Sequence, residues 1–255
     1  MNPRVLYDEI RRIMESKESN IVLAADLDKI REVISIAKDV GDEIVILKTH
    51  VDIYEDFTHE SLNELKDISQ EMDFLIMEDR KFCDIGKTVE RQYSKGTFRI
   101  VDWAHLVTVS LLPGPGILDG ISRVIENRKL TGRRGVVLLA RMSSNGNLAR
   151  GEYTEKCIDT SIQRKDLVTG LIVTGEEILK AREKTGREIL LFTPGVRITR
   201  GTGELGQRYL SVEEVINLGT DLIIVGSGIT SSSDPMSKVS EYRKLAWKYY
   251  SSSSL

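Results

Sequence analysis

Apolar residues gather in short runs along the chain, and polar stretches of a different period separate these runs. The runs are rich in Val, Ile and Leu and lack polar alternation, which is typical of parallel strands buried on both faces. They lie at residues 20–27, 43–50, 73–81, 100–109, 135–143, 167–174, 188–196 and 221–229. Stretches between them, such as 28–41 and 59–72, carry apolar residues at helical spacing. The pattern therefore predicts strands and amphipathic helices in alternation.

This alternation occurs about eight times and predicts a (β/α)8 TIM barrel of the α/β class. We expect a single domain over residues 1–255, because no linker or composition shift divides the chain. An open doubly wound sheet usually has a glycine-rich phosphate loop after its first strand, whereas "AADLD" at 24–28 contains no glycine. Residues 1–16 have the pattern of an amphipathic helix and not of a signal peptide. We expect a loop at 230–234 and a frayed end at 251–255.

The composition narrows the classes of partner. The 36 Lys and Arg residues nearly balance the 39 Asp and Glu residues, which argues against a nucleic-acid partner. No apolar run approaches the roughly 20 residues that span a bilayer, so we expect no membrane partner. Cys83 and Cys157 have neither metal-ligand nor disulfide spacing, which suits a cytoplasmic protein. We expect Cys83 to be a small buried residue rather than a nucleophile.

Charged residues fall at the ends of the predicted strands, where a TIM barrel assembles its active site. Asp26 ends the first run, Lys48 and His50 end the second, and Asp79 and Lys81 end the third. Asp79 and Lys81 are two residues apart and so share a face of their strand. If that face is the barrel interior, they must neutralise each other or a ligand. The fifth, seventh and eighth runs end near Ser143, Pro194 and Ser227.

Two motifs carry a resemblance to a known family. "LKTHVDI" and, about thirty residues later, "EDRKFCDIG" resemble the orotidine 5'-monophosphate decarboxylase family of eukaryotic type, whose signature is Asp-x-Lys-x-x-Asp at the end of the third strand. The blocks "MSSNGNLARGEYT", "FTPGV", "LGQRY", "DLIIVGSGI" and "YRKLAWKYY" follow in the family's order. A lone motif is a weak signal, but several ordered blocks over nearly the whole chain are specific.

The resemblance implies a decarboxylation of orotidine 5'-monophosphate to uridine 5'-monophosphate and carbon dioxide in de novo pyrimidine biosynthesis, without cofactor or metal. It implies a catalytic network of Lys48, Asp79, Lys81 and Asp84, in which Lys81 protonates C6 of the ring. A fixed ammonium there would stabilise the developing carbanion and supply the proton. The resemblance also implies a homodimer in which Asp84 and Thr88 reach into the neighbouring subunit's site.

The resemblance further implies a set of contacts to the nucleotide. Asp26 and Lys48 would hold ribose hydroxyls, and Ser143 with the backbone near Pro194 would contact the pyrimidine. Gln207 and Tyr209 would bind the phosphate. The substrate-binding residues that we expect are Asp26, His50, Thr88, Ser143, Pro194, Gln207, Tyr209, Gly226 and Ser227.

The chain departs from the family pattern at three places. The family's last strand ordinarily ends in Gly-Arg-Gly, whose arginine clamps the 5'-phosphate, and Ser227 stands in that place. Residues 108–110 replace an Asn-Ala-His sequence, and Arg141 replaces a glutamate. The phosphate site is therefore expected to be weaker, or to use a substitute cation such as Arg141, Arg197 or Arg208.

Three interpretations stay open at this point. The chain could be a working decarboxylase, a non-catalytic homologue that serves as a binding or structural protein, or a different phosphosugar enzyme on the same barrel. The retained network of Lys48, Asp79, Lys81 and Asp84 favours the first, because a protein without catalysis has no need of a costly buried charge array. The ordered motifs argue against the third.

Overall fold

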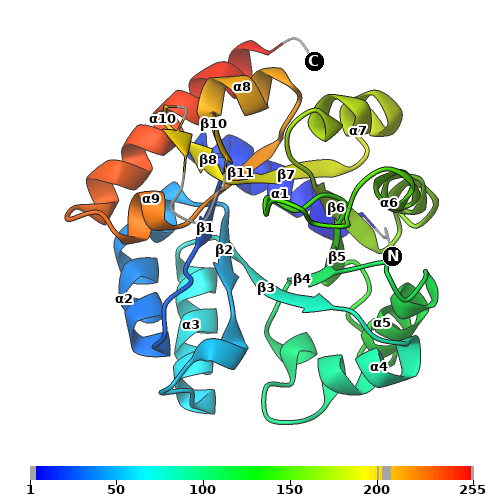
Figure 1. Ribbon diagram of the computed structural model, residues 1–255. Coiled ribbons are helices and arrows are strands. Elements are labelled where there is room, and N and C mark those ends of the chain that lie inside the picture. Colours follow the sequence, from blue (N-terminus) through cyan, green and yellow to red (C-terminus); the bar gives the residue numbers. More distant parts are fainter. Residues whose placement is uncertain (1–3, 200, 203–207, 254–255) are drawn as a thin grey trace.

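Eight parallel strands close into a barrel that helices surround (Figure 1). The computed structural model describes residues 4–199, 201–202 and 208–253. Pairing of Val22 in the first strand with Ile224 in the last one closes the barrel and confirms the predicted fold. The barrel strands are β1 (Ile21–Ala24), β2 (Ile46–Thr49), β3 (Leu75–Phe82), β4 (Leu106–Val109), β5 (Gly135–Leu139), β6 (Val168–Ile172), β7 (Leu190–Pro194) and β11 (Leu222–Val225).

The order of the strands decides which side chains can meet across the barrel. Around the ring the order is β1-β11-β7-β6-β5-β4-β3-β2, so β3 and β7 lie four positions apart on opposite sides. Seven of the eight barrel strands lie within one of the predicted apolar runs, and β3 extends one residue beyond its run, to Phe82. Strands β1 and β2 are buried along their whole length, as expected where helices cover the barrel and side chains fill its interior.

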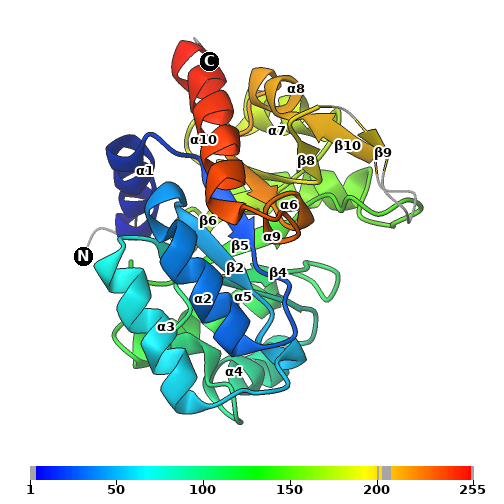
Figure 2. The same ribbon diagram turned by 90° about the vertical axis from the view of Figure 1, so that its left-hand side faces the viewer.

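The helices form the outer layer, and Figure 2 shows the long C-terminal helix α10 packed along one side of the barrel. Amphipathic sequences explain their placement; in α2, for example, Ile30, Val33, Ile34 and Ala37 are buried at helical spacing. The helices are α1 (Val5–Lys17), α2 (Ile30–Val40), α3 (His59–Glu71), α4 (Gly86–Ser94), α5 (Gly116–Asn127), α6 (Glu152–Gln163), α7 (Glu177–Thr185), α8 (Val212–Asn217), α9 (Ser227–Thr230) and α10 (Pro235–Ser252).

A small sheet after β7 was not predicted. Its strands are β8 (Val196–Arg197), β9 (Gly201–Thr202) and β10 (Arg208–Ser211); β10 pairs with β8 in parallel and with β9 in antiparallel orientation. The run 188–196 is therefore two strands, because Gly195 has a φ of 70° and turns the chain between them. This sheet brings Arg197 to the same end of the barrel as the charged strand ends.

Some details differ from the sequence predictions. Residues 251–252 form the last turn of α10 instead of a frayed end. The last barrel strand ends at Val225, so Ser227 opens α9 instead of ending the strand. Cys83 is exposed and not buried, because the chain leaves the barrel wall after the buried Phe82. The run 100–109 begins with a 3-10 turn at Ile100–Asp102, and its strand starts only at Leu106.

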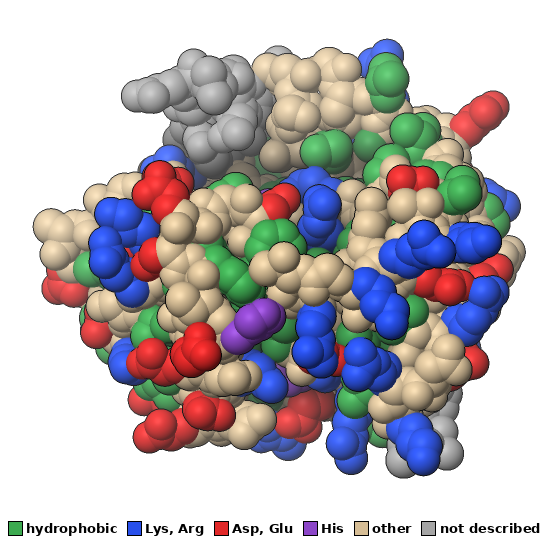
Figure 3. All heavy atoms as spheres, turned by 90° about the horizontal axis from the view of Figure 1, so that it is seen from below, with side chains coloured by type: hydrophobic (Ala, Val, Ile, Leu, Met, Phe, Trp, Pro, Cys, Tyr) green, Lys and Arg blue, Asp and Glu red, His purple; other side chains and the backbone are tan. Residues whose placement is uncertain are grey.

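Charges of both signs cover the face that Figure 3 shows, with Asp and Glu mainly on its left half and Lys and Arg mainly on its right half. This distribution agrees with the near balance of charge in the sequence. Within the described residues, no helix has the length and apolar character needed to cross a membrane.

Candidate active site

A pocket of about 380 Å³ lies at the carboxyl ends of the barrel strands. It brings together nine residues that the sequence pointed to, from strands far apart along the chain: Asp26, Lys48, His50, Asp79, Lys81, Ser143, Pro194, Gly226 and Ser227. Apolar side chains from β5, β6 and β11, namely Leu139, Ile172 and Ile224, complete its inner wall. The pocket thus combines a charged cluster with an apolar floor.

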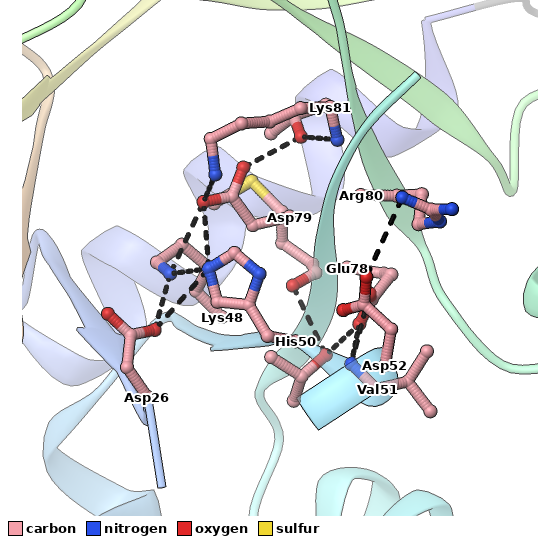
Figure 4. Close-up of polar contacts among 12 residues, drawn as sticks. Asp26, Lys48, His50, Val51, Asp52, Glu78, Asp79, Arg80 and Lys81 are labelled. Carbon is pink, nitrogen blue, oxygen red and sulfur yellow. Dashed lines mark hydrogen bonds and ion pairs between the residues drawn. The ribbon is translucent and has the colours of Figure 1, made fainter. Parts of the chain in front are cut away.

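Lys48 lies at the centre of the charged cluster (Figure 4). Its Nζ is 2.7 Å from Oδ1 of Asp26 and 3.3 Å from Oδ2 of Asp79. Nε2 of His50 lies 3.1 Å from the same Nζ and 3.3 Å from Oδ2 of Asp79. Lys48 and Asp79 are buried, whereas Asp26 is exposed at the pocket rim. The cluster therefore reaches from the interior to the surface.

Lys81 forms the other side of this cluster. Its Nζ donates to Oδ2 of Asp79 at 2.6 Å, so one carboxylate lies between two ammonium groups. Thr108 of β4 completes the arrangement: its hydroxyl donates to Oδ1 of Asp79 at 2.7 Å and accepts from the backbone N–H of Lys81 at 2.9 Å. Thr108 thereby holds both the carboxylate and the backbone that carries the ammonium.

The backbone at Lys81 has an unusual conformation. Its φ is 49°, in the left-handed region that costs a residue with a side chain roughly 1 kcal/mol. The register between β3 and β4 shifts between Glu78 and Phe82, as at a β-bulge, which redirects side chains and is common next to active sites. The Thr108 hydrogen bond helps to hold this conformation. Strain at such a position is often part of a functional site.

The surroundings of Asp79 stabilise its ionised form. Burial by itself would raise the pKa of this carboxyl. The hydrogen bond from His50 and the charges of Lys48 and Lys81 outweigh burial and hold the pKa of Asp79 well below its usual range. Asp79 is therefore a permanent negative charge in the pocket at neutral pH.

Glu78, the neighbour of Asp79, points away from the pocket and is fully buried. Thr49 Oγ1 lies 2.7 Å from its Oε2, and the backbone N–H of Val51 donates to both carboxyl oxygens. Burial raises the pKa of Glu78 to about 8, although these hydrogen bonds oppose the shift. The two adjacent carboxyls therefore differ in charge at neutral pH, with Glu78 largely protonated.

Replacing Glu78 by glutamine should change how stability depends on pH. Between pH 4.5 and 8 the folded protein keeps a proton on Glu78 that the unfolded chain has lost, so the free energy of unfolding falls as pH rises through this window. The loss is roughly 4 kcal/mol over the window, from about 1.4 kcal/mol per pH unit. Urea unfolding at pH 5 and pH 8 should show this fall for the wild type and a smaller one for Glu78→Gln. A matched control is Glu183→Gln, at an exposed position of α7. If the free energy of unfolding falls equally from pH 5 to pH 8 in all three proteins, the raised pKa of Glu78 is not the cause.

Two predicted catalytic and binding residues do not line the pocket of this chain. Asp84 follows β3, and its carboxylate accepts from the backbone N–H of Ile85 at 2.7 Å. Thr88 lies in the first turn of α4. Gln207 lies outside the described residues, and Tyr209 belongs to β10 but its side chain is likewise outside what the structure describes.

The contacts of Thr108 were not predicted from the sequence, and the position of Arg197 was left open. Thr108 was noted only as a departure from the family pattern, although a polar residue inside the apolar run "LVTV" was a usable signal. Arg197 was one of three possible substitute cations, and the structure places it in the pocket wall. Within the part of the chain that the structure describes, no group of three His, Cys, Asp or Glu residues could hold a metal ion.

A closed barrel with a charged pocket at the carboxyl ends of its strands is characteristic of TIM-barrel enzymes. The sequence profile of the "Orotidine 5'-phosphate decarboxylase / HUMPS family" matches residues 19–242. The chain belongs to this family, in agreement with the resemblance that its motifs carry.

Similar proteins support this membership. Orotidine 5'-phosphate decarboxylase of Coccidioides posadasii is 38% identical, over 98% of this chain and 92% of the relative. Uridine 5'-monophosphate synthase of Bos taurus is 41% identical over 95% of this chain, which spans 48% of that protein. Among solved structures, orotidine 5'-monophosphate decarboxylase of Methanocaldococcus jannaschii with inhibitor BMP has a TM-score of 0.68 at 20% identity, covering 89% of this chain and 98% of the other, and supports the fold.

Proposed function

We propose that this protein decarboxylates orotidine 5'-monophosphate to uridine 5'-monophosphate and carbon dioxide, using its own side chains without cofactor or metal. The observation that carries the proposal is the position of the Asp79 carboxylate, between the ammonium groups of Lys48 and Lys81 in one pocket. A protein that only bound nucleotide would have no need of this buried array, because burying charges is costly. Family membership supports the same reaction.

The array fits the chemistry of the reaction. Loss of carbon dioxide from C6 of the pyrimidine leaves carbanion character at that carbon. The Lys81 ammonium would stabilise this charge and then donate its proton to C6, while its hydrogen bond to Asp79 would fix its position. The two lysines, Asp26 and Asp79 balance one another in formal charge.

The remaining pocket residues have positions that suit nucleotide binding. Asp26 and Lys48 form an ion pair near the rim, which suits hydrogen bonding to ribose hydroxyls. Ser143 and Pro194 lie beyond β5 and at the end of β7, where they would contact the pyrimidine. Gly226 and Ser227 line the wall next to them. His50 would assist by donating from its Nε2 to the Asp79 carboxylate.

We further propose that the active form is a homodimer to which Asp84 and Thr88 contribute across the interface. Neither residue lines the pocket of its own chain. Two exposed apolar side chains support a covered surface: Ile85, which follows Asp84, is 63% exposed, and Leu112, in the loop before α5, is 74% exposed. Large apolar side chains that stand so far into solvent often mark interfaces.

Cys83 and Cys157, which form no disulfide, support a cytoplasmic location.

The test of the reaction is an assay of the purified protein with orotidine 5'-monophosphate. We expect loss of the orotate absorbance, with uridine 5'-monophosphate as the product on chromatography, and the same rate after exhaustive treatment with a metal chelator. Tight binding of the nucleotide without any conversion would instead favour the non-catalytic homologue.

A further inference from the structure

Thr108 lies beside the charged cluster but does not line the pocket. It belongs to β4 and is fully buried, and its hydroxyl contacts both Asp79 and Lys81 of β3. Since Thr108 is not part of the pocket wall, any effect that it has on the reaction must pass through these two residues. The contacts of this single hydroxyl therefore decide what Thr108 can do.

Thr108 faces an irregular stretch of the neighbouring strand. The register of β3 against β4 shifts between Glu78 and Phe82, where a step of four residues along β3 corresponds to a step of two along β4. Thr108 is the residue of β4 in the middle of that step, and Asp79 and Lys81 belong to the extra length of β3. An irregularity of this kind redirects side chains. Thr108 is thus the residue of β4 that lies opposite both redirected charges.

The two hydrogen bonds of Thr108 fix the direction of its hydroxyl proton. A hydroxyl has one proton to donate and lone pairs with which to accept. The backbone N–H of Lys81 can only donate, so the hydroxyl accepts from it at 2.9 Å. The hydroxyl proton is left for Oδ1 of Asp79, 2.7 Å away, whereas the Lys81 ammonium binds the other oxygen, Oδ2. Thr108 therefore fixes which carboxylate oxygen faces the ammonium.

One hydroxyl in this way supports Lys81 at both of its ends. The φ of 49° at Lys81 lies in a region that is unfavourable for a residue with a side chain, and such a conformation persists only where its surroundings hold it. Thr108 holds the backbone directly, and through Asp79 it fixes the partner of Nζ at 2.6 Å (Figure 4). A catalytic group that moves by about 1 Å can lose roughly a hundredfold in rate.

We infer that Thr108 is a positioning residue of the decarboxylation, whose hydroxyl sets the place of the Lys81 ammonium against C6 of the pyrimidine. The inference rests on the proposed function for the reaction and for its proton donor. Thr108 acts on turnover and not on nucleotide affinity, because it supports the proton donor from outside the pocket wall.

Kinetics of two variants at this position test the inference. Thr108→Val exchanges the hydroxyl for a methyl group and should lower kcat for orotidine 5'-monophosphate by roughly ten- to a hundredfold, because the ammonium is no longer held in place. The Kd for uridine 5'-monophosphate should stay close to that of the wild type. Thr108→Ser keeps the hydroxyl and should recover most of the lost kcat. Each kcat is taken per nucleotide-binding site, so that unfolded protein does not count.

Thr220→Val is the matched control, because it also removes a buried hydroxyl that is bonded to another side chain. The Thr220 hydroxyl lies 2.7 Å from that of Thr193, and Thr220 precedes β11, at the amino end of the barrel strands and away from the pocket. Thr220→Val should lower the melting temperature but keep the wild-type kcat per site.

Several results would overturn the inference and leave the proposed function standing. They are an unchanged kcat per site in Thr108→Val, a Thr108→Ser variant as slow as Thr108→Val, a loss of nucleotide affinity as large as the loss of kcat, and an equal loss of kcat in Thr220→Val. If Thr108→Val does not fold, Thr108→Ala, which removes the hydroxyl without adding a methyl group in its place, decides between the same outcomes. No conversion by the wild type would overturn the inference and the proposed function together.

Discussion

Replacing Lys81 by alanine should lower kcat for orotidine 5'-monophosphate by at least about 10⁴-fold, since the variant loses both the proton donor and the charge that stabilises the carbanion. The protein should still fold, because the Lys81 side chain is 38% exposed and Asp79 keeps Lys48 and His50 as partners. Binding of uridine 5'-monophosphate should therefore change much less than turnover.

The assay compares kcat, nucleotide affinity and melting temperature for Lys81→Ala and for Lys38→Ala. Lys38 lies on α2, where it forms an exposed ion pair with Glu64, so its loss removes a lysine without touching the pocket. Wild-type kcat in Lys81→Ala would contradict the assigned role. An equal loss in kcat and in folded protein would show that Lys81 acts through stability instead.

Two inactive variants should restore activity when they share a dimer. If a site uses Lys81 of one subunit and Asp84 of the other, a heterodimer of Lys81→Ala and Asp84→Asn contains one site with both defects and one with neither. Co-expression with two different affinity tags, followed by purification on both, should yield heterodimers with about half the wild-type rate per dimer. Each variant alone should have less than about 1% of that rate, because each lacks a charge of the network.

The same experiment distinguishes a shared site from one built within a single chain. If Asp84 acts in its own subunit, both sites of the heterodimer carry one defect, and the purified heterodimer stays inactive. As a control, the heterodimer of Lys81→Ala with wild type should also show half activity, since one of its Lys81 residues is intact. A fully active monomer in sedimentation would separately refute the proposed dimer.

The barrel could be predicted from the sequence because its signal is local. A strand covered on both faces is largely apolar, and seven of the eight strands lie within one such run, while β3 extends one residue beyond its run, to Phe82. The ends of the strands could be predicted less well from the sequence. Residues 100–109 form one mostly apolar run, yet the structure divides them into a 3-10 turn and β4, because burial and strand pairing are different properties. The small sheet of β8, β9 and β10 has strands too short to carry a period.

The candidate site could be predicted in part, because a TIM barrel places strand ends at one mouth. The sequence alone predicted four charged residues at this mouth, and all four line the pocket: Asp26, Lys48, Asp79 and Lys81. The bridge from Thr108 to Asp79 could not be predicted, since it depends on the register of β3 against β4. Which of the three possible cations reaches the pocket depends on a turn and on side-chain direction, and these also come only from the fold.

The most direct measurement of the central claim uses orotidine 5'-monophosphate with a labelled carboxyl carbon. We expect the wild-type protein to release one labelled carbon dioxide for each uridine 5'-monophosphate formed, over many turnovers per chain, and Lys81→Ala to release none above background in the same time. If the wild-type protein binds the nucleotide but the label stays in it, the proposed decarboxylation is wrong. The protein would then be a non-catalytic homologue that binds nucleotide.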